Sequence, residues 1–285
     1  MLIDTHAHLD YPEFQQDFAG ILERARTAGV ERIITIGTGL ESSDCAVALA
    51  REHSMIYAVV GVHPTNGFEA PENFIDTLRE IAKHPRVAAI GETGLDYHHL
   101  PSADMAHPFQ DMYRMEVAQD PNAISAELAD QSYKNNQKTA FEMQLDLAVE
   151  LGLNVVVHQR DAWDDTLEIL SPYTGKLRAV FHCFGGTPEQ AAEILEMGHL
   201  VSFTGIVTFK NAQNVRDVAA TITSDRFMVE TDCPYLAPLP YRGKRCEPAY
   251  TRLVAEKLAE VRREDFETVC QHTTQTAENF FRLKG

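Results

Sequence analysis

The chain has 285 residues, of which 44% are hydrophobic and 24% are charged, a composition typical of a globular protein with a large core. Aspartate and glutamate outnumber lysine and arginine by 42 to 25, so the formal net charge is −17 and a broad basic surface for nucleic acid is disfavoured. The longest apolar runs contain about eight residues, far fewer than the roughly 18 that span a bilayer.

Short apolar runs rich in β-branched residues alternate with longer amphipathic segments along the whole chain. Eight such runs predict strands, at residues 2–5, 32–36, 56–62, 87–90, 154–157, 179–181, 200–203 and 227–229. Between them, apolar residues spaced three or four apart predict helices with one buried face, as at Phe18, Ile21, Leu22 and Ala25. Continuous apolar strands, each followed by a helix, are typical of a parallel sheet covered by helices.

One segment, residues 98–136, departs from this alternation. It is 39 residues long, where a short loop would connect the fourth strand to the helix expected from about Gln137. Amphipathic stretches at 109–117 and, more weakly, at 124–128 predict a helical insertion. The segment is acidic, since it contains six aspartates and glutamates but only Arg114 and Lys134 among lysines and arginines. An insertion of this kind fits a lid or an oligomer contact.

Eight strand–helix units fit either an open doubly wound sheet or a closed barrel. Eight units in about 250 residues is the usual size of a (β/α)8 barrel, so the count favours closure. We predict an α/β fold, a single (β/α)8 TIM barrel over residues 1–285, with the insertion in the loop after strand four.

The predicted strands lead directly into histidines and carboxylates, residue types that can bind metal ions. These residues are His6, His8, His63, Glu92, His158, His182 and Asp232. The carboxyl ends of barrel strands meet at one face, where such enzymes place their chemistry. His6 and His8 are two apart on an extended segment, so both side chains point the same way. A meeting of His6 with Asp232 also favours a barrel, because the first and eighth strands are neighbours only when the sheet closes.

Without His63, the expected ligands number six, more than one tetrahedral ion needs. Two divalent cations that share a bridging carboxylate are the economical arrangement. Imidazole and carboxylate ligands together suit zinc, manganese, cobalt or nickel. Glu230 lies two residues before Asp232, on the same side of the strand, and is expected to be a buried carboxylate that orients a ligand.

The segments around these residues resemble the TatD family of metal-dependent deoxyribonucleases, within the amidohydrolase superfamily. The segments are HAH at 6–8, GVHP at 61–64, GETGLDY at 91–97, HQRDA at 158–162, HCFGG at 182–186 and ETDCPYLAP at 230–238. The resemblance implies that one metal is held by His6, His8, Glu92 and Asp232. It implies that Glu92 bridges to a second metal held by His158 and His182, and that His63 and Arg160 lie near the substrate. Magnesium is often named for this family and is therefore a further candidate for the two cations, beside the softer ions.

The resemblance implies hydrolysis of phosphodiester bonds in DNA, at chain ends or in single strands. We expect a hydroxide that bridges the two metals to attack phosphorus in line, with Asp232 as ligand and proton acceptor and Glu92 as the bridge. The loop after the eighth strand, YRGKR at 241–245, offers Arg242, Lys244 and Arg245 to phosphates. The family usually has a much shorter loop where this chain carries the acidic insertion.

The same metals would also serve an alternative function, hydrolysis of small amide, lactone or ester substrates, including aminoacyl-tRNA esters. The acidic insertion favours this alternative for small molecules, and the basic loop opposes it. The sequence leaves the oligomeric state open.

The five cysteines are an odd number, scattered and without a C-x-x-C pair, so no disulfide framework is expected. The chain becomes polar by Asp4, which opposes a signal peptide. We predict a cytoplasmic protein with reduced thiols and no membrane contact.

Overall fold

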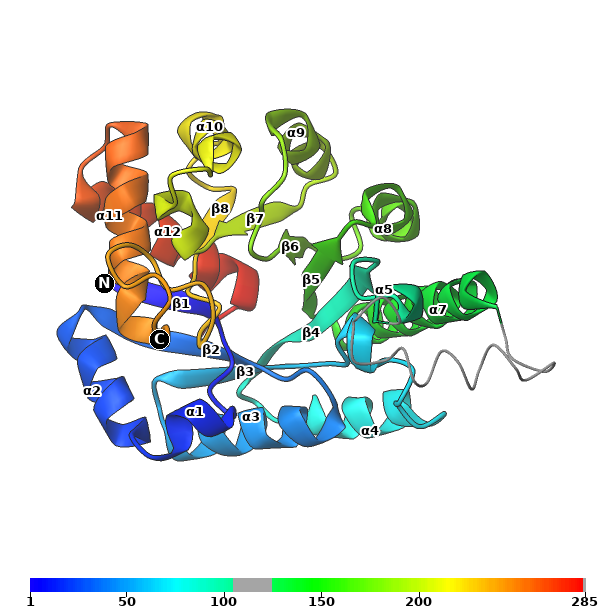
Figure 1. Cartoon of the computed structure of the whole chain (residues 1–285). Helices are drawn as coiled ribbons and strands as arrows, with labels where there is room; N and C mark the ends of the chain where they lie inside the picture. The colour runs from blue at the N-terminus through cyan, green and yellow to red at the C-terminus, as the bar shows by residue number, and fades with distance from the viewer. Residues whose placement is uncertain (105–124, 284–285) are drawn as a thin grey trace.

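The computed structural model describes residues 1–104 and 125–283 of the chain. Eight parallel strands form one sheet, in which each strand pairs with its sequence neighbours (Figure 1). The strands are β1 (Leu2–Ala7), β2 (Val30–Ile36), β3 (Ile56–Val60), β4 (Val87–Asp96), β5 (Asn154–Arg160), β6 (Ala179–Phe181), β7 (Leu200–Phe203) and β8 (Phe227–Val229).

Helices connect and cover these strands. They are α1 (Pro12–Gln15), α2 (Phe18–Thr27), α3 (Leu40–Glu52), α4 (Phe74–Ile81), α5 (Pro101–Asp104), α7 (Ala126–Leu151), α8 (Trp163–Leu170), α9 (Pro188–Glu196), α10 (Gln213–Thr221), α11 (Thr251–Arg262) and α12 (Phe266–Phe281). The 3₁₀ turns are η1 (Pro64–Asn66), η3 (Ser171–Tyr173), η4 (Gly205–Thr208) and η5 (Pro248–Tyr250). Within the described ranges, none of the helices combines the length and the apolar character that crossing a bilayer requires.

The sheet closes where the carboxyl end of β1 meets the segment that follows β8. Ala7 forms a parallel bridge with Cys233, and the backbone N–H of His8 donates to the Cys233 carbonyl at 2.9 Å. The N–H of Asp232 donates to the His6 carbonyl at 2.8 Å. This pairing confirms the predicted (β/α)8 barrel over an open sheet, and it brings the first and last strands together at one end.

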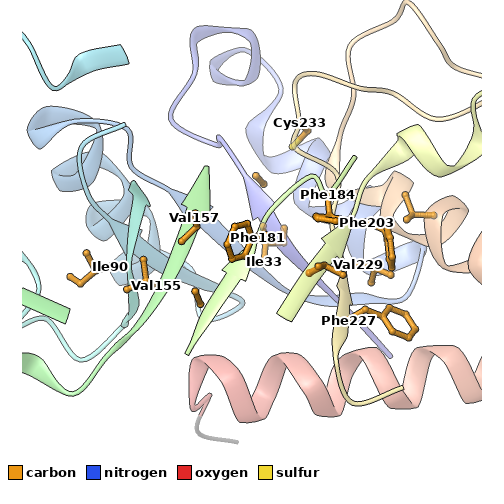
Figure 2. Close-up of a cluster of buried hydrophobic side chains, with 14 of the residues drawn as sticks. Ile33, Ile90, Val155, Val157, Phe181, Phe184, Phe203, Phe227, Val229 and Cys233 are labelled. Carbon is orange, nitrogen blue, oxygen red and sulfur yellow. The ribbon is translucent and has the colours of Figure 1, made fainter. Parts of the chain in front are cut away.

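The apolar core and helix α12 together leave one end of the barrel accessible. Figure 2 shows strand residues of the larger buried cluster, including Val155, Val157, Phe181 and Phe203. Helix α12 crosses the opposite, amino-terminal ends of the strands. Its hydroxyl and carbonyl groups bond to Met1, to Asn154 at the start of β5, and to Ser224 just before β8. The carboxyl ends of the strands are therefore the end left for a site.

The helix expected from about Gln137 begins eleven residues earlier, at Ala126, so that boundary was wrong. Ser125 caps the helix by accepting a hydrogen bond from the Leu128 N–H at 3.3 Å. No glycine or proline interrupts residues 126–151, and Gly152 ends the helix in a left-handed conformation at φ +65°. The end of the insertion is thus the first part of α7, as the weak pattern at 124–128 indicated. The predicted stretch at 109–117 lies outside the described residues.

His199, at the amino-terminal end of β7, links folding stability to pH. The side chain is fully buried, and Nδ1 accepts a hydrogen bond from the Ala179 N–H at 3.2 Å. Burial, with a contribution from the Arg178 charge, lowers the pKa of His199 to about 4. Below about pH 6.5 the unfolded chain therefore binds a proton that the folded chain rejects, and stability falls as the pH falls towards 4.

We expect the His199 contribution to the free energy of unfolding to decrease by about 3 kcal/mol across that window. The measurement is urea unfolding at several pH values for the wild type and for His199→Gln, which retains a hydrogen-bond acceptor. The variant should lose less stability between pH 6.5 and pH 4.5. Parallel curves for the two proteins would contradict this linkage.

Candidate metal centre

The polar residues predicted at the strand ends meet in one cavity of about 1450 Å³. Its wall includes six of them directly: His8, His63, Glu92, His158, His182 and Asp232. His6 lies beneath them, fully buried. The cavity is therefore at the carboxyl end of the barrel, where the sequence predicted the site.

Glu92 stands at the centre, and its two carboxylate oxygens face different groups of histidines. Oε2 lies 3.3 Å from His6 Nε2 and 3.9 Å from His8 Nε2. Oε1 lies 2.9 Å from His158 Nδ1 and 2.8 Å from His182 Nε2. One carboxylate thus connects two sets of nitrogen donors, one on each side.

The sequence predicted that the ligands follow their strands, but some of them lie inside the strands. His6, Glu92 and His158 lie inside β1, β4 and β5, whose pairing continues beyond the apolar runs, whereas His182 and Asp232 follow β6 and β8. Gly94 shows why β4 continues. It pairs with His158, and a Cβ atom at Gly94 would lie 2.0 Å from the His158 carbonyl oxygen. Only glycine allows the two strands to approach so closely here.

Asp232 is positioned by an unusual backbone conformation. Its φ is +59°, in the left-handed region that aspartate tolerates better than most residues. Oδ1 then lies 3.6 Å from His6 Nε2 and 3.4 Å from His8 Nε2. His6, His8 and Asp232 form one group whose ligand atoms are close enough to hold a metal ion.

Two further carboxylates contact the histidines from behind. Glu230 accepts a hydrogen bond from the Cys183 N–H at 2.6 Å, and Oε1 of Glu230 lies 3.7 Å from His182 Nδ1. It is buried, as its spacing from Asp232 predicted, and with His6 and His182 it forms a group close enough to hold a metal ion. Asp96, which the sequence reasoning did not select, has Oδ2 at 3.2 Å from His158 Nε2 and at 2.9 Å from His99 Nδ1. Asp96 lies four residues after Glu92 on the same strand, and this even spacing was the available signal.

The electrostatic environment places Glu92 and His6 in the forms that bind metal ions. Burial alone would raise the pKa of Glu92, but the neighbouring His182, His6 and His63 hold it well below its usual range. Burial, assisted by His182, lowers the pKa of His6, which keeps the imidazole neutral. A carboxylate anion and neutral imidazoles are the forms that bind divalent cations.

Unpaired nitrogen atoms test whether these residues suit metal ions. Both ring nitrogens of His6, Nδ1 of His8 and Nδ1 of His182 are buried without a hydrogen-bond partner in the described structure. A buried polar atom without a partner costs free energy, which ligation of a cation would recover for the nitrogens that face the cluster. The donor set therefore fits metal ions.

The residues predicted to contact substrate fall into two places. His63 and Arg160 line the cavity, and His63 Nε2 lies 3.6 Å from Glu92 Oε1. His63, Glu92 and His158 form another group able to hold a metal ion, so His63 is also placed as a ligand would be.

Arg242, Lys244 and Arg245 are not among the described residues that line the cavity. Arg245 donates to the Glu13 carbonyl at 2.7 Å and lies 3.8 Å from Glu247. Arg242 lies over the Phe209 ring, at 4.3 Å from its centroid. The structure therefore does not bring this basic loop together with the ligand cluster.

Comparison with known proteins identifies the family of this chain. Residues 3–282 match the family described as TatD related DNase. The chain is 37% identical over 284 residues to the uncharacterized metal-dependent hydrolase YabD of Bacillus subtilis, covering 99% of this chain and 100% of that protein. It is 32% identical over 286 residues to the 3'-5' ssDNA/RNA exonuclease TatD of Enterobacter lignolyticus, covering 98% of each.

Among solved structures, the TatD homologue YJJV of Escherichia coli superposes with a TM-score of 0.83 at 26% identity, over 99% of this chain and 98% of that one. The family match and the relatives span essentially the whole barrel, including every residue of the ligand cluster. The chain therefore belongs to the TatD family and is a metal-dependent hydrolase.

Proposed function

We propose that this chain hydrolyses phosphodiester bonds from the ends of single-stranded DNA, using two divalent cations. The observation that carries the proposal is the position of the Glu92 carboxylate, whose two oxygens face separate groups of histidines. A bridging carboxylate of this kind is typical of two-metal sites that clamp a phosphoryl group. A relative named as a 3'-5' exonuclease of single-stranded DNA and RNA supports the substrate class.

The residues that would hold the cations are His6, His8 and Asp232 on one side of Glu92 and His158 and His182 on the other. When bound, such cations polarise phosphoryl oxygens and lower the pKa of an attacking water. Zinc, manganese, cobalt and nickel suit the imidazole donors best, and magnesium remains a candidate through the family resemblance.

Asp232 is the proposed proton acceptor. Burial would raise the pKa of Asp232, but a hydrogen bond with His8 and the nearby His6 and His182 lower it, so the carboxylate is ionised and able to accept a proton. It also lines the cavity, where its partner Glu92 is almost fully enclosed. Asp232 is thus the carboxylate of the cluster best placed to take a proton from an attacking water.

The cavity wall provides contacts for a nucleotide. Arg160 is exposed there and offers a cation to a phosphate. Tyr235 is 52% exposed, and Trp163 also lines the wall, so both present ring surface to a base. Arg242, Lys244 and Arg245 would then serve more distant phosphates. All five cysteines are free thiols, which supports the cytoplasm as the location we propose.

The competing function is hydrolysis of small amides, lactones or esters, which the acidic residues Asp161 and Asp164 on the cavity wall favour. One metal-loaded sample should be assayed on end-labelled single-stranded DNA, single-stranded RNA, bis(p-nitrophenyl) phosphate and a series of lactones. We expect the linear DNA to shorten progressively with release of mononucleotides. Circular single-stranded DNA is the matched control and should remain uncut. Turnover of lactones without cleavage of any phosphodiester would favour the competing function.

A further inference from the structure

Phe68 and Tyr133 form an aromatic pair beside the metal-ligand cavity. We propose that this pair is a stacking subsite for a nucleobase of the substrate chain, beyond the phosphate that is cleaved. The proposal rests on the proposed nuclease function and adds to it a binding site that requires a polynucleotide rather than a single phosphodiester.

The two rings offer an exposed face at a defined position. Phe68 is 63% exposed, the largest exposed fraction among the aromatic side chains of the described residues. Its ring centroid lies 6.2 Å from that of Tyr133, with the ring planes tilted by 36°. Tyr133 itself lines the cavity that contains Glu92 and Asp232. The pair therefore extends the wall of the site outward with aromatic surface.

The local structure holds the Tyr133 ring in place and brings the loop that carries Phe68 close to α7. The Tyr133 hydroxyl donates to the Thr65 carbonyl at 2.9 Å. Gly67 lets the loop approach α7 closely, because a Cβ atom there would lie 3.1 Å from Asn136 Oδ1 and 3.6 Å from Ala140 Cβ. Positions 133, 136 and 140 lie on one face of the helix. Rings that are fixed before binding lose less conformational freedom when a base stacks on them.

The pair is connected to the ligand cluster through His63. Nε2 of His63 lies 3.6 Å from Glu92 Oε1, and Nδ1 lies 2.7 Å from Thr65 Oγ1. The Thr65 carbonyl in turn accepts a hydrogen bond from the Tyr133 hydroxyl, and the Phe68 ring contacts the Tyr133 ring. A chain with a phosphate at Glu92 can therefore follow this wall to place a later base on the rings.

Stacking suits the charge of this molecule. With a net charge of −17 and acidic residues at the cavity, extended phosphate contacts are disfavoured. Every base has a π-face, and its stacking on an aromatic ring requires no basic residue. Tyr133 also belongs to the 98–136 insertion, so this segment acquires a role in substrate binding.

The test measures kcat and KM for the metal-loaded wild type and for Phe68→Ala, on an oligothymidylate and on bis(p-nitrophenyl) phosphate. Loss of the stacking surface should raise KM for the oligonucleotide about tenfold, with KM for the small reporter unchanged. Phe68→Trp should restore the oligonucleotide KM, whereas Phe68→Leu, which keeps apolar volume, should not. Leu128→Ala is the matched control, since Leu128 lies on α7 with Tyr133 and is 64% exposed, close to the 63% of Phe68.

The outcomes separate this inference from the proposed function. An unchanged oligonucleotide KM in Phe68→Ala, or equal changes on both substrates, would overturn the stacking subsite while leaving the nuclease function intact. Failure of the wild type to cleave any oligonucleotide would instead overturn the proposed function itself.

Discussion

Asp232→Asn should lower kcat on single-stranded DNA by about 10²- to 10⁴-fold while most of the bound metal remains. The amide has nearly the shape of the carboxylate, and its oxygen can still face His6 and His8, at the positions where Oδ1 now lies 3.6 Å and 3.4 Å away. The amide cannot accept a proton, so the loss falls on turnover. Steady-state kinetics and metal analysis of the same protein sample check both parts.

Asp161→Asn is a suitable control for this prediction. Asp161 also follows a strand, β5, and also has a left-handed backbone, with φ +54°. Its carboxylate pairs with the exposed His98 at 3.0 Å, away from Glu92. Because Asp161 lines the cavity but is not a proposed ligand, the kcat of Asp161→Asn should stay close to the wild-type value, and any effect should fall on KM. Normal turnover in Asp232→Asn would remove Asp232 from proton transfer, and loss of metal together with turnover would reduce its role to ligation.

The strands and the barrel could be predicted because each strand contains a short apolar run that the packed sheet requires. The start of α7 could not, because residues 126–136 form a helix whose surface is mainly polar and carries little apolar periodicity. There the Ser125 cap and packing against neighbouring elements determine the structure. The contact between Ser102 and Asp130, at 2.6 Å, joins the two described ends of the insertion and has no sequence signature.

The ligand residues could be selected from sequence because parallel strands bring their carboxyl ends to one place. For Asp96 the even spacing from Glu92 was too weak a signal by itself, since its significance comes from contacts with His158 and His99 that exist only in the folded chain. The basic loop at 241–245 shows the reverse error, because the sequence selected it but the structure does not bring it to the ligand cluster. Its position is determined by partners such as Glu13, more than two hundred residues away from Arg245 in the sequence.

Glu92→Gln should weaken binding of both metal ions and lower turnover by at least about 10²-fold. The reason is geometric, because Oε2 faces His6 and His8 while Oε1 faces His158 and His182. Replacing the carboxylate by an amide removes the negative charge from both sides at once. Metal content per chain, measured by mass spectrometry over a titration with Mn²⁺, reports the change independently of activity.

Two variants that each remove one donor from one side of Glu92 test whether its carboxylate bridges two metal ions. His8→Ala removes a donor only from the Oε2 side, and His158→Ala removes one only from the Oε1 side, so each should weaken one metal ion and spare the other. Thermal unfolding gives a second readout, because ions that bind only the folded chain raise its Tm with concentration. The Mn²⁺-dependent rise should be largest in the wild type, smaller in each histidine variant and smallest in Glu92→Gln. If Glu92→Gln lost one ion and bound the other as tightly as the wild type, the carboxylate would be a ligand of a single metal, and the division of its two oxygens between the histidine groups would not be a bridge.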